Sequence, residues 1–400
     1  MKVLVINCGS SSIKYKLYDM EREDELCSGL LERVGTNDCI VNHKKNSEKF
    51  QENIPITDYE TGIKKILSLI TDSNLGVLKD VHELGAIGHR VVHGAETFSG
   101  SRLITNDVVA KMEECIPLAP LHNPPNLAGI YAFRKILPDV PQCGVFDTAF
   151  HQTMPKEAYL YAIPYELYAK HAVRRYGFHG TSHLYVSQEA AKFLNKPYNK
   201  LKIITCHLGN GSSIAAVNCG ESIDTSMGMT PLEGLIMGTR CGDLDPALPF
   251  FLMDKEGLDR KNVDNLLNKK SGLLGICGYN DSRDVEDGML RGDERCKLAF
   301  NMFCRRLKKY IGAYAAVMGG LDAVVFTAGI GENSNHTRAK TCDDLEFLGI
   351  KIDDSKNEEQ TKVVRDISAP DAKVKVLVIP TNEELVIARD TNKIVNTVKK

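Results

Sequence analysis

The sequence predicts an α/β protein made of two domains. Three observations carry this prediction. The chain has 400 residues, more than one domain usually holds; short β-branched runs alternate with amphipathic stretches; and one strand–turn–strand pattern occurs twice. Hydrophobic residues form 43% of the chain and charged residues 26%, a balance typical of a globular protein with a sizeable core.

The alternation can be followed along the chain. Strands are expected at short apolar runs, namely Val3–Asn7, Ile13–Tyr18, Ala86–Arg90, Gly144–Asp147, Ile203–His207, Ile214–Asn218, Ala323–Thr327 and Val374–Ile379. Helices are expected at amphipathic stretches, namely Ile63–Thr71, Asn106–Glu114, Leu127–Leu137, Cys296–Met318 and Glu384–Lys399. Strands and helices mixed in this order indicate sheets covered by helices.

The repeated pattern suggests an internal duplication. VLVINCGSSSIKYKLY near the start and KIITCHLGNGSSIAAV later in the chain both read as a strand, a Gly/Ser turn and a strand, and Ser11–Ile13 corresponds to Ser212–Ile214. Two related domains would each open with such a hairpin and face a shared cleft. A coincidence between two Gly/Ser hairpins is the alternative.

The net charge, the N-terminus and the cysteine content indicate which partners, location and thiol state to expect. The net charge is −2 without a basic tract, so neither a nucleic acid nor an anionic membrane is expected as a partner. The apolar run at the N-terminus is too short for a signal peptide, no stretch approaches membrane-spanning length, and a cytoplasmic location is expected. The twelve cysteines form no CxxC pair or zinc-type cluster with histidine, so we expect reduced thiols, many of them buried.

Polar residues that could take part in catalysis or binding lie at predicted strand ends and in turns that contain glycine, where functional residues are usually found. They are Asn7, Ser10, Ser12, Lys14, Arg90, His122, Asp147, His179, Arg240 and Glu383. Each also has a structural alternative, such as a surface ion pair for Arg90 or a helix N-cap for Asp147 and Glu383. The glycines of Thr327–Asn333 follow a strand and would let a phosphate approach the backbone, but they match neither a Walker A loop nor a Rossmann fingerprint.

Nine phrases occur together in the order and spacing of the acetate kinase family: MKVLVINCGSSSIKY, HRVVHG, LAPLHNPPN, FDTAFH, RRYGFHGTSH, CHLGNGSS, TPLEGLIMGTRCGDLDP, FTAGIGEN and PTNEELVIARDT. The chain resembles this family from Met1 to Lys400. The resemblance implies the duplicated ribonuclease-H-like fold of the actin-like ATPases, with an active-site cleft between two domains. Residues 1–150 plus 384–400 would form the first domain, and 151–383 the second, with the nucleotide-binding segments. Hinge closure over ATP and a homodimer are also implied.

The resemblance further implies reversible transfer of the γ-phosphoryl group of ATP to acetate, giving acetyl phosphate and ADP by direct in-line attack, with Mg²⁺ or in its place Mn²⁺. The residues that match the family's catalytic groups are Arg90, Asp147, His179 and Arg240. Those that match its acetate site are Arg90, Val92, Leu121, His122, Phe178 and Pro231. The ATP-binding matches are Ser10, Ser12, Lys14, His207, Leu208, Gly209, Asn210, Gly211, Asp281, Ser282, Arg283, Gly329, Ile330, Gly331, Glu332 and Asn333. Asn7 and Glu383 match the Mg²⁺ ligands.

This reaction requires positive charge more than a base. A carboxylate with a pKa near ~4 is already ionised at neutral pH, so the obstacle is its repulsion from ATP. One cation at roughly 4 Å contributes at most on the order of 4 kcal/mol, or about a thousandfold in rate. Arg90, Arg240, Lys14, His179 and Mg²⁺ would supply the charge. Asp147 is expected to orient an arginine or a Mg²⁺-bound water and not to shuttle a proton.

Two positions depart from the family pattern, and two other functions stay open. Cys241 stands where serine is commoner, and Gly278–Asp284 is atypical on the adenosine side. Gly329 and Gly331 favour ATP over pyrophosphate, and Val92 leaves room for acetate more than for propionate. The alternatives are a propionate or butyrate kinase, and a non-catalytic actin-like nucleotide-binding protein.

Overall fold

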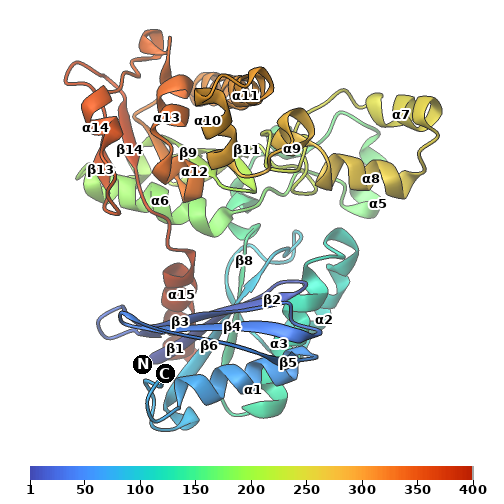
Figure 1. Ribbon diagram of the computed structural model, residues 1–400, viewed down its shortest axis with the longest axis vertical. Helices are drawn as coiled ribbons and strands as arrows, with labels where there is room; N and C mark the ends of the chain where they lie inside the picture. Colours follow the sequence, from blue (N-terminus) through green and yellow to red (C-terminus); the bar gives the residue numbers. More distant parts are fainter. Residues whose placement is uncertain (399–400) are drawn as a thin grey trace. The chain divides into compact units, whose positions relative to one another are not determined.

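The computed structural model describes residues 1–398, and contacts between residues divide the chain into two units. Unit 1 contains Met1–Ala149 and the segment from Asn382 onward, and unit 2 contains Phe150–Thr381. Each unit is built around one β-sheet with helices packed on it (Figure 1). The predicted α/β class is therefore confirmed.

Unit 1 has an eight-stranded sheet in the order β5-β4-β3-β2-β1-β6-β8-β7. Its strands are β1 Lys2–Cys8, β2 Ser12–Asp19, β3 Asp24–Glu32, β4 Thr36–Lys45, β5 Glu48–Ile56, β6 Leu84–Val91, β7 Arg102–Leu103 and β8 Gln142–Phe146. Its helices are α1 Tyr59–Ile70, α2 Asn106–Glu114, α3 Asn123–Ile136 and α15 Glu383–Val398.

Unit 2 has a six-stranded sheet in the order β11-β10-β9-β12-β14-β13. Its strands are β9 Lys202–Leu208, β10 Ser212–Asn218, β11 Glu221–Thr225, β12 Ala323–Thr327, β13 Arg365–Asp366 and β14 Lys375–Val378. Its helices are α4 Lys156–Tyr159, α5 Tyr165–His171, α6 Gly180–Phe193, α7 Leu248–Glu256, α8 Arg260–Lys269, α9 Gly272–Cys277, α10 Ser282–Leu290, α11 Glu294–Met318, α12 Ala328–Asn333, α13 Asn335–Cys342 and α14 Asp354–Glu358.

The two sheets share a common core, which supports the duplication suggested by the repeated hairpin. In unit 1, β3, β2 and β1 pair antiparallel, and β1, β6 and β8 pair parallel. In unit 2, β11, β10 and β9 pair antiparallel, and β9, β12 and β14 pair parallel. The β1–β2 and β9–β10 hairpins occupy the same place in this order, in keeping with the sequence match of Ser11–Ile13 to Ser212–Ile214.

Helices bury their apolar faces against these cores. The helix α15, dark red in Figure 1, packs on β1, β6 and β8 through Leu385, Ala388 and Val395. In unit 2, α11 packs on β9 and β10 through buried side chains such as Phe303, Leu307 and Ile311, spaced three or four residues apart. Each such side chain contributes about 1.5–3 kcal/mol when fully buried.

Every strand and helix expected from the sequence occurs within a few residues of its expected bounds, and β12 and α2 match at both ends. The expected end of the last helix at Lys399 lies outside the described residues. The meander β3–β5, most helices of unit 2 and the short edge strands were not predicted. All twelve cysteines are free thiols and nine of them are buried, as expected.

Candidate active site

In unit 1, Arg90 and Asp147 form an ion pair at the carboxyl ends of two adjacent parallel strands. Arg90 is the penultimate residue of β6, and Asp147 follows β8 directly. The Nε of Arg90 donates to Oδ1 of Asp147 at 3.3 Å, and Nη2 donates to Oδ2. Asp147 is 1% exposed and the Arg90 side chain 23% exposed. One edge of the guanidinium is therefore held by the carboxylate, which is the fork geometry that arginine favours.

Asn7 and Glu383 lie beside this pair. The Nη1 of Arg90 is 3.4 Å from Oδ1 of Asn7. Burial alone would lower the pKa of Arg90, but the charges of Asp147 and Glu383 outweigh it and raise the pKa. Burial raises the pKa of Glu383, whereas the Arg90 charge opposes that rise. Asn382, not Glu383, caps α15 by accepting from the backbone N–H of Leu385 at 3.2 Å, so the N-cap alternative for Glu383 is wrong.

The β1–β2 hairpin carries three more candidate site residues, Ser10, Ser12 and Lys14. Ser10 is exposed and Ser12 half-buried, and the backbone N–H of Gly9 donates to the carbonyl of Ser12 at 2.8 Å. Lys14 is half-exposed and forms an ion pair with Glu384, which is 17% exposed. The charges of Lys14 and Lys16 lower the pKa of Glu384 against the effect of its burial.

The candidate acetate residues of unit 1 differ in burial. Val92 is 7% exposed, and its backbone N–H donates to Oδ1 of Asn126 in α3 at 3.1 Å. Leu121 is 67% exposed, and His122 directly precedes α3. Of the two apolar side chains, Val92 is the one fixed by its surroundings.

In unit 2, His179 and His207 form a stacked pair. His179 immediately precedes α6 with a left-handed backbone (φ 55°, ψ 23°), a conformation that non-glycine residues adopt rarely and often at functional sites. Its ring stacks on that of His207, with centroids 4.2 Å apart and planes inclined by 17°. The Nδ1 of His179 lies 2.8 Å from Oγ of Ser213, so the ring is held from two sides.

Arg240 lies next to His179 and Gly211. A side chain added at Gly211 would place its Cβ 3.5 Å from both Nη1 of Arg240 and Nε2 of His179. Arg240 donates from Nη1 to the carbonyl of Pro231 at 3.2 Å, and burial lowers its pKa. Within residues 1–398, no carboxylate pairs with its guanidinium. Phe178, the residue before His179, is buried.

The candidate ATP-binding segments of unit 2 converge on one end of its sheet. Thr327 at the end of β12 pairs with His207 in β9, so the turn Gly209–Gly211 and the helix α12 begin side by side. A Cβ at Gly331 would lie 3.2 Å from the carbonyl carbon of Phe326, whereas Gly329 has open space. Ile330 is buried, and Glu332 accepts from the backbone N–H groups of Ala328 and Thr381 at 2.9 and 3.1 Å.

The segment Asp281–Arg283 lies close to the same turn. The N–H of Gly238 donates to the carbonyl of Asn210, and a Cβ at Gly238 would lie 2.8 Å from the carbonyl of Asn280. Asp281 caps α10 and also binds the exposed guanidinium of Arg283. Leu208 is buried within β9 and Asn333 is exposed at the end of α12.

The sequence did not identify Ser213 or His183 as site residues. Ser213 contacts His179 directly, and His183 is linked to His179 through the Ser213 hydroxyl. Two signals were present in the sequence: Ser213 is the counterpart of Ser12, and His183 follows His179 by one helical turn.

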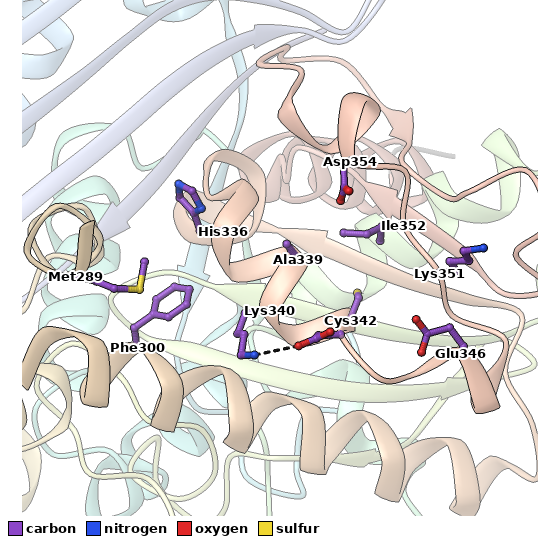
Figure 2. A pocket seen from close by; sticks show the side chains of 11 residues that line it. Met289, Phe300, His336, Ala339, Lys340, Cys342, Glu346, Lys351, Ile352 and Asp354 are labelled. Carbon is purple, nitrogen blue, oxygen red and sulfur yellow. Dashed lines mark hydrogen bonds and ion pairs between the residues drawn. The ribbon is translucent and has the colours of Figure 1, made fainter. Parts of the chain in front are cut away.

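Several hollows in the described part of the chain are lined by none of Arg90, Asp147, His179 and Arg240, although one contains Lys14 and another Ser282 and Ile330. Figure 2 shows one of about 470 Å³ between α10, α11 and α13, lined by Met289, Phe300, His336, Cys342 and Glu346 among others. Among its charged side chains, Lys340 pairs with Asp343 and Lys351 with Asp371. The catalytic candidates are thus identified by their charge and hydrogen bonds, not by the size of a hollow.

Residues 1–398 contain neither a metal-binding cluster nor a membrane-spanning helix of the kinds described next. No cluster of three or more His, Cys, Asp or Glu side chains is arranged to hold a metal ion. No helix of this part of the chain is long and apolar enough to cross a bilayer.

Comparison with known proteins gives one consistent family. The model of the acetokinase family matches residues 2–389. An acetate kinase of Thermotoga petrophila is 57% identical over the full length of both chains, and one of Carboxydothermus hydrogenoformans is 56% identical over 99% of each. The crystal structure of Porphyromonas gingivalis acetate kinase superimposes with a TM-score of 0.95 at 51% identity, covering 98% of this chain and 99% of that one. A propionate kinase of Francisella tularensis gives 0.92 at 44% identity with the same coverage.

Proposed function

Because the chain belongs to the acetokinase family, we propose that it is an enzyme that reversibly transfers the γ-phosphoryl group of ATP to acetate. The observation that carries the proposal is the partly buried guanidinium of Arg240, which no carboxylate balances within residues 1–398. A buried cation without a counter-charge is costly unless an anion binds there. A transferring phosphoryl group is such an anion.

Arg90 is the proposed ligand of the acetate carboxylate. Asp147 occupies its Nε and Nη2, which leaves the Nη1 edge, beside Asn7, as the side that meets the substrate. Acetate is already ionised at neutral pH, so it attacks without a general base. Asp147 therefore serves to hold the guanidinium in one orientation. Val92, which is buried and follows Arg90 by two residues, is the proposed limit on the space for a longer chain.

Arg240 and His179 are the proposed groups that stabilise charge on the phosphoryl group in flight. Both approach Gly211, since Nη1 of Arg240 and Nε2 of His179 each lie 3.5 Å from the position of a Cβ on that residue. Each well-placed cation contributes on the order of 4 kcal/mol at most, at roughly 4 Å and an effective dielectric of about 20. Alignment and charge neutralisation are the main sources of catalysis in phosphoryl transfer generally.

The residues at the metal position fit Mg²⁺. Asn7 and Glu383 offer one amide oxygen and one carboxylate, and Mg²⁺ commonly takes one or two protein oxygens together with phosphate oxygens and water. When bound with ATP, the ion supplies charge neutralisation at the phosphates. Glu383 also bears a negative charge beside Arg90, so it links the metal position to the acetate position.

We further propose that the two units are the two functional domains and act on one pair of substrates, that the protein is cytoplasmic and that it forms a homodimer. The helix α7 exposes Leu248, Phe250 and Phe251, a set of apolar side chains of the kind that subunit contacts cover.

The test is a steady-state assay of acyl phosphate, trapped as hydroxamate, with ATP, Mg²⁺ and acetate, propionate or butyrate. Acetate is expected to give the highest kcat/KM. A propionate kinase is also among the structural matches, and a higher kcat/KM for propionate would establish that alternative. Arg90→Ala should abolish product while ATP still binds, whereas Arg102→Ala, an exposed arginine of the same unit, should not. Product formation at the wild-type rate by Arg90→Ala would refute the proposal.

A further inference from the structure

A chain of hydrogen bonds leads from the interior of unit 2 to His179. The Nδ1 of His179 lies 2.8 Å from Oγ of Ser213, and the same Oγ lies 2.7 Å from Nε2 of His183. The Nδ1 of His183 lies 2.7 Å from Oγ1 of Thr205. His183, Ser213 and Thr205 are fully buried. In the order His179–Ser213–His183–Thr205, one hydroxyl group therefore joins the two imidazoles and a second hydroxyl group ends the chain.

Donor counting gives this chain a direction. Each hydroxyl has one proton to donate, and a neutral imidazole has one N–H and one acceptor nitrogen. If His179 donated from Nδ1, Ser213 would donate to His183, and His183 would donate to Thr205. The Thr205 proton would then lack an acceptor, because Thr205 has no second side-chain partner within residues 1–398. A buried donor left unpaired is costly, so this direction is disfavoured.

The opposite direction satisfies every group. Thr205 donates to Nδ1 of His183, His183 donates from Nε2 to Ser213, and Ser213 donates to Nδ1 of His179. This order requires a neutral His183, and burial together with the neighbouring His151 and His207 lowers the pKa of His183 well below its ordinary value. The proton of a neutral His179 then resides on Nε2, the nitrogen that approaches Gly211 on the side of Arg240.

We infer that Thr205, His183 and Ser213 are positioning residues that hold His179 in the Nε2–H tautomer. The stacked ring of His207 fixes the plane of the same imidazole. His179 is thereby prepared to donate a hydrogen bond toward the Gly211 turn without first exchanging a proton with solvent. The catalytic consequence rests on the proposed function, whereas the tautomer itself does not.

The tautomer can be measured directly on the full-length protein. Two-bond ¹H–¹⁵N correlation spectra of ¹⁵N-histidine-labelled protein distinguish Nε2–H, Nδ1–H and doubly protonated rings, and the His179 signals are those lost in His179→Gln. The wild type is expected to show the Nε2–H form at neutral pH. A wild-type spectrum with Nδ1–H or a doubly protonated His179 overturns the inference, whether or not any variant folds.

Variants of Thr205 test the origin of the preference. Thr205→Val removes the terminal donor without much change of shape, so the two directions become comparable and a mixture of tautomers is expected. In that variant kcat should fall roughly tenfold, near the upper end of what one hydrogen bond contributes, with KM values within about twofold. Thr205→Ser keeps the donor and should restore both readouts.

Ser187→Ala is the matched control. Ser187 is also buried, lies in the same helix as His183 and donates to Leu184 while contacting Tyr198, so its loss perturbs packing without touching the chain to His179. An unchanged tautomer and kcat in Thr205→Val, or equal effects in Ser187→Ala, would overturn the positioning role. A wild-type protein without acetate-dependent turnover would instead refute the proposed function and leave the tautomer result standing.

Discussion

Replacing Asp147 by asparagine separates an orienting role from a proton-transfer role. Asp147 receives two hydrogen bonds from Arg90 and is 1% exposed. The amide of Asp147→Asn can accept one of these bonds but presents N–H groups to the other guanidinium nitrogen. Losing one charge-assisted hydrogen bond costs about 1.5–3 kcal/mol, which corresponds to a decrease in kcat/KM of roughly 10- to 150-fold.

The assay is the pH dependence of kcat/KM for acetate in wild type and Asp147→Asn. If Asp147 only orients Arg90, the variant profile keeps the wild-type shape and is scaled down. The loss of one ionisation limb would refute this reasoning, because it would identify Asp147 as a group that must ionise during the reaction. Asp139→Asn, an exposed acid just before β8, should leave the profile unchanged.

A double-mutant cycle gives an independent check of the same claim. Since Asp147 acts through Arg90, the Asp147→Asn change should have little further effect in an Arg90→Ala background. Full additivity of the two losses would mean that Asp147 contributes by another route.

Three further predictions follow from burial. Burial lowers the pKa values of His89 and His151 to about 4, so the unfolded chain takes up protons near pH 6.5 that the folded chain does not. In urea unfolding, the free energy of unfolding should therefore fall as the pH drops from about 6.5 toward 4, by about 2 kcal/mol per histidine at pH 5. The variant His89→Gln should show a flatter dependence on pH. Burial raises the pKa of Cys241, so alkylation at neutral pH should inactivate slowly, and rapid inactivation that Cys241→Ser prevents would contradict this. Val92→Ala should raise the propionate-to-acetate ratio of kcat/KM by roughly tenfold, within the 1–3 kcal/mol of one methylene, whereas Leu121→Ala at its exposed position should change it little.

Much of the fold could be predicted because its central strands are buried on both faces. Strands such as β9 and β12 consist of apolar runs that are legible in the sequence. The meander escaped notice because its strands are only half-buried, and β5 carries Glu48, Lys49 and Glu52 among its nine residues. Its pattern of burial alternates, but its composition resembles a polar loop.

The candidate site could be predicted residue by residue only through the family's motifs. The motifs do not show which residues far apart in the sequence form pairs in the folded protein. Lys14 was expected to contact phosphate, and its pairing with Glu384 depends on α15 returning to β2 across the whole chain. Likewise Thr205 reads as one more β-branched residue of a strand, and its hydroxyl acquires a role only when α6 brings His183 against it.

The return of α15 to the first sheet has a consequence for synthesis on the ribosome. Gly88 of β6 approaches Ile387 and Thr391 of α15 so closely that an added Cβ would lie within 2.7 Å of both side chains. Until α15 is translated, the face of β1, β6 and β8 on which it packs lacks this helix, although those strands were made first. Residues 150–381, which form unit 2, emerge completely before α15 does. Unit 2 should therefore complete its fold on the ribosome before unit 1.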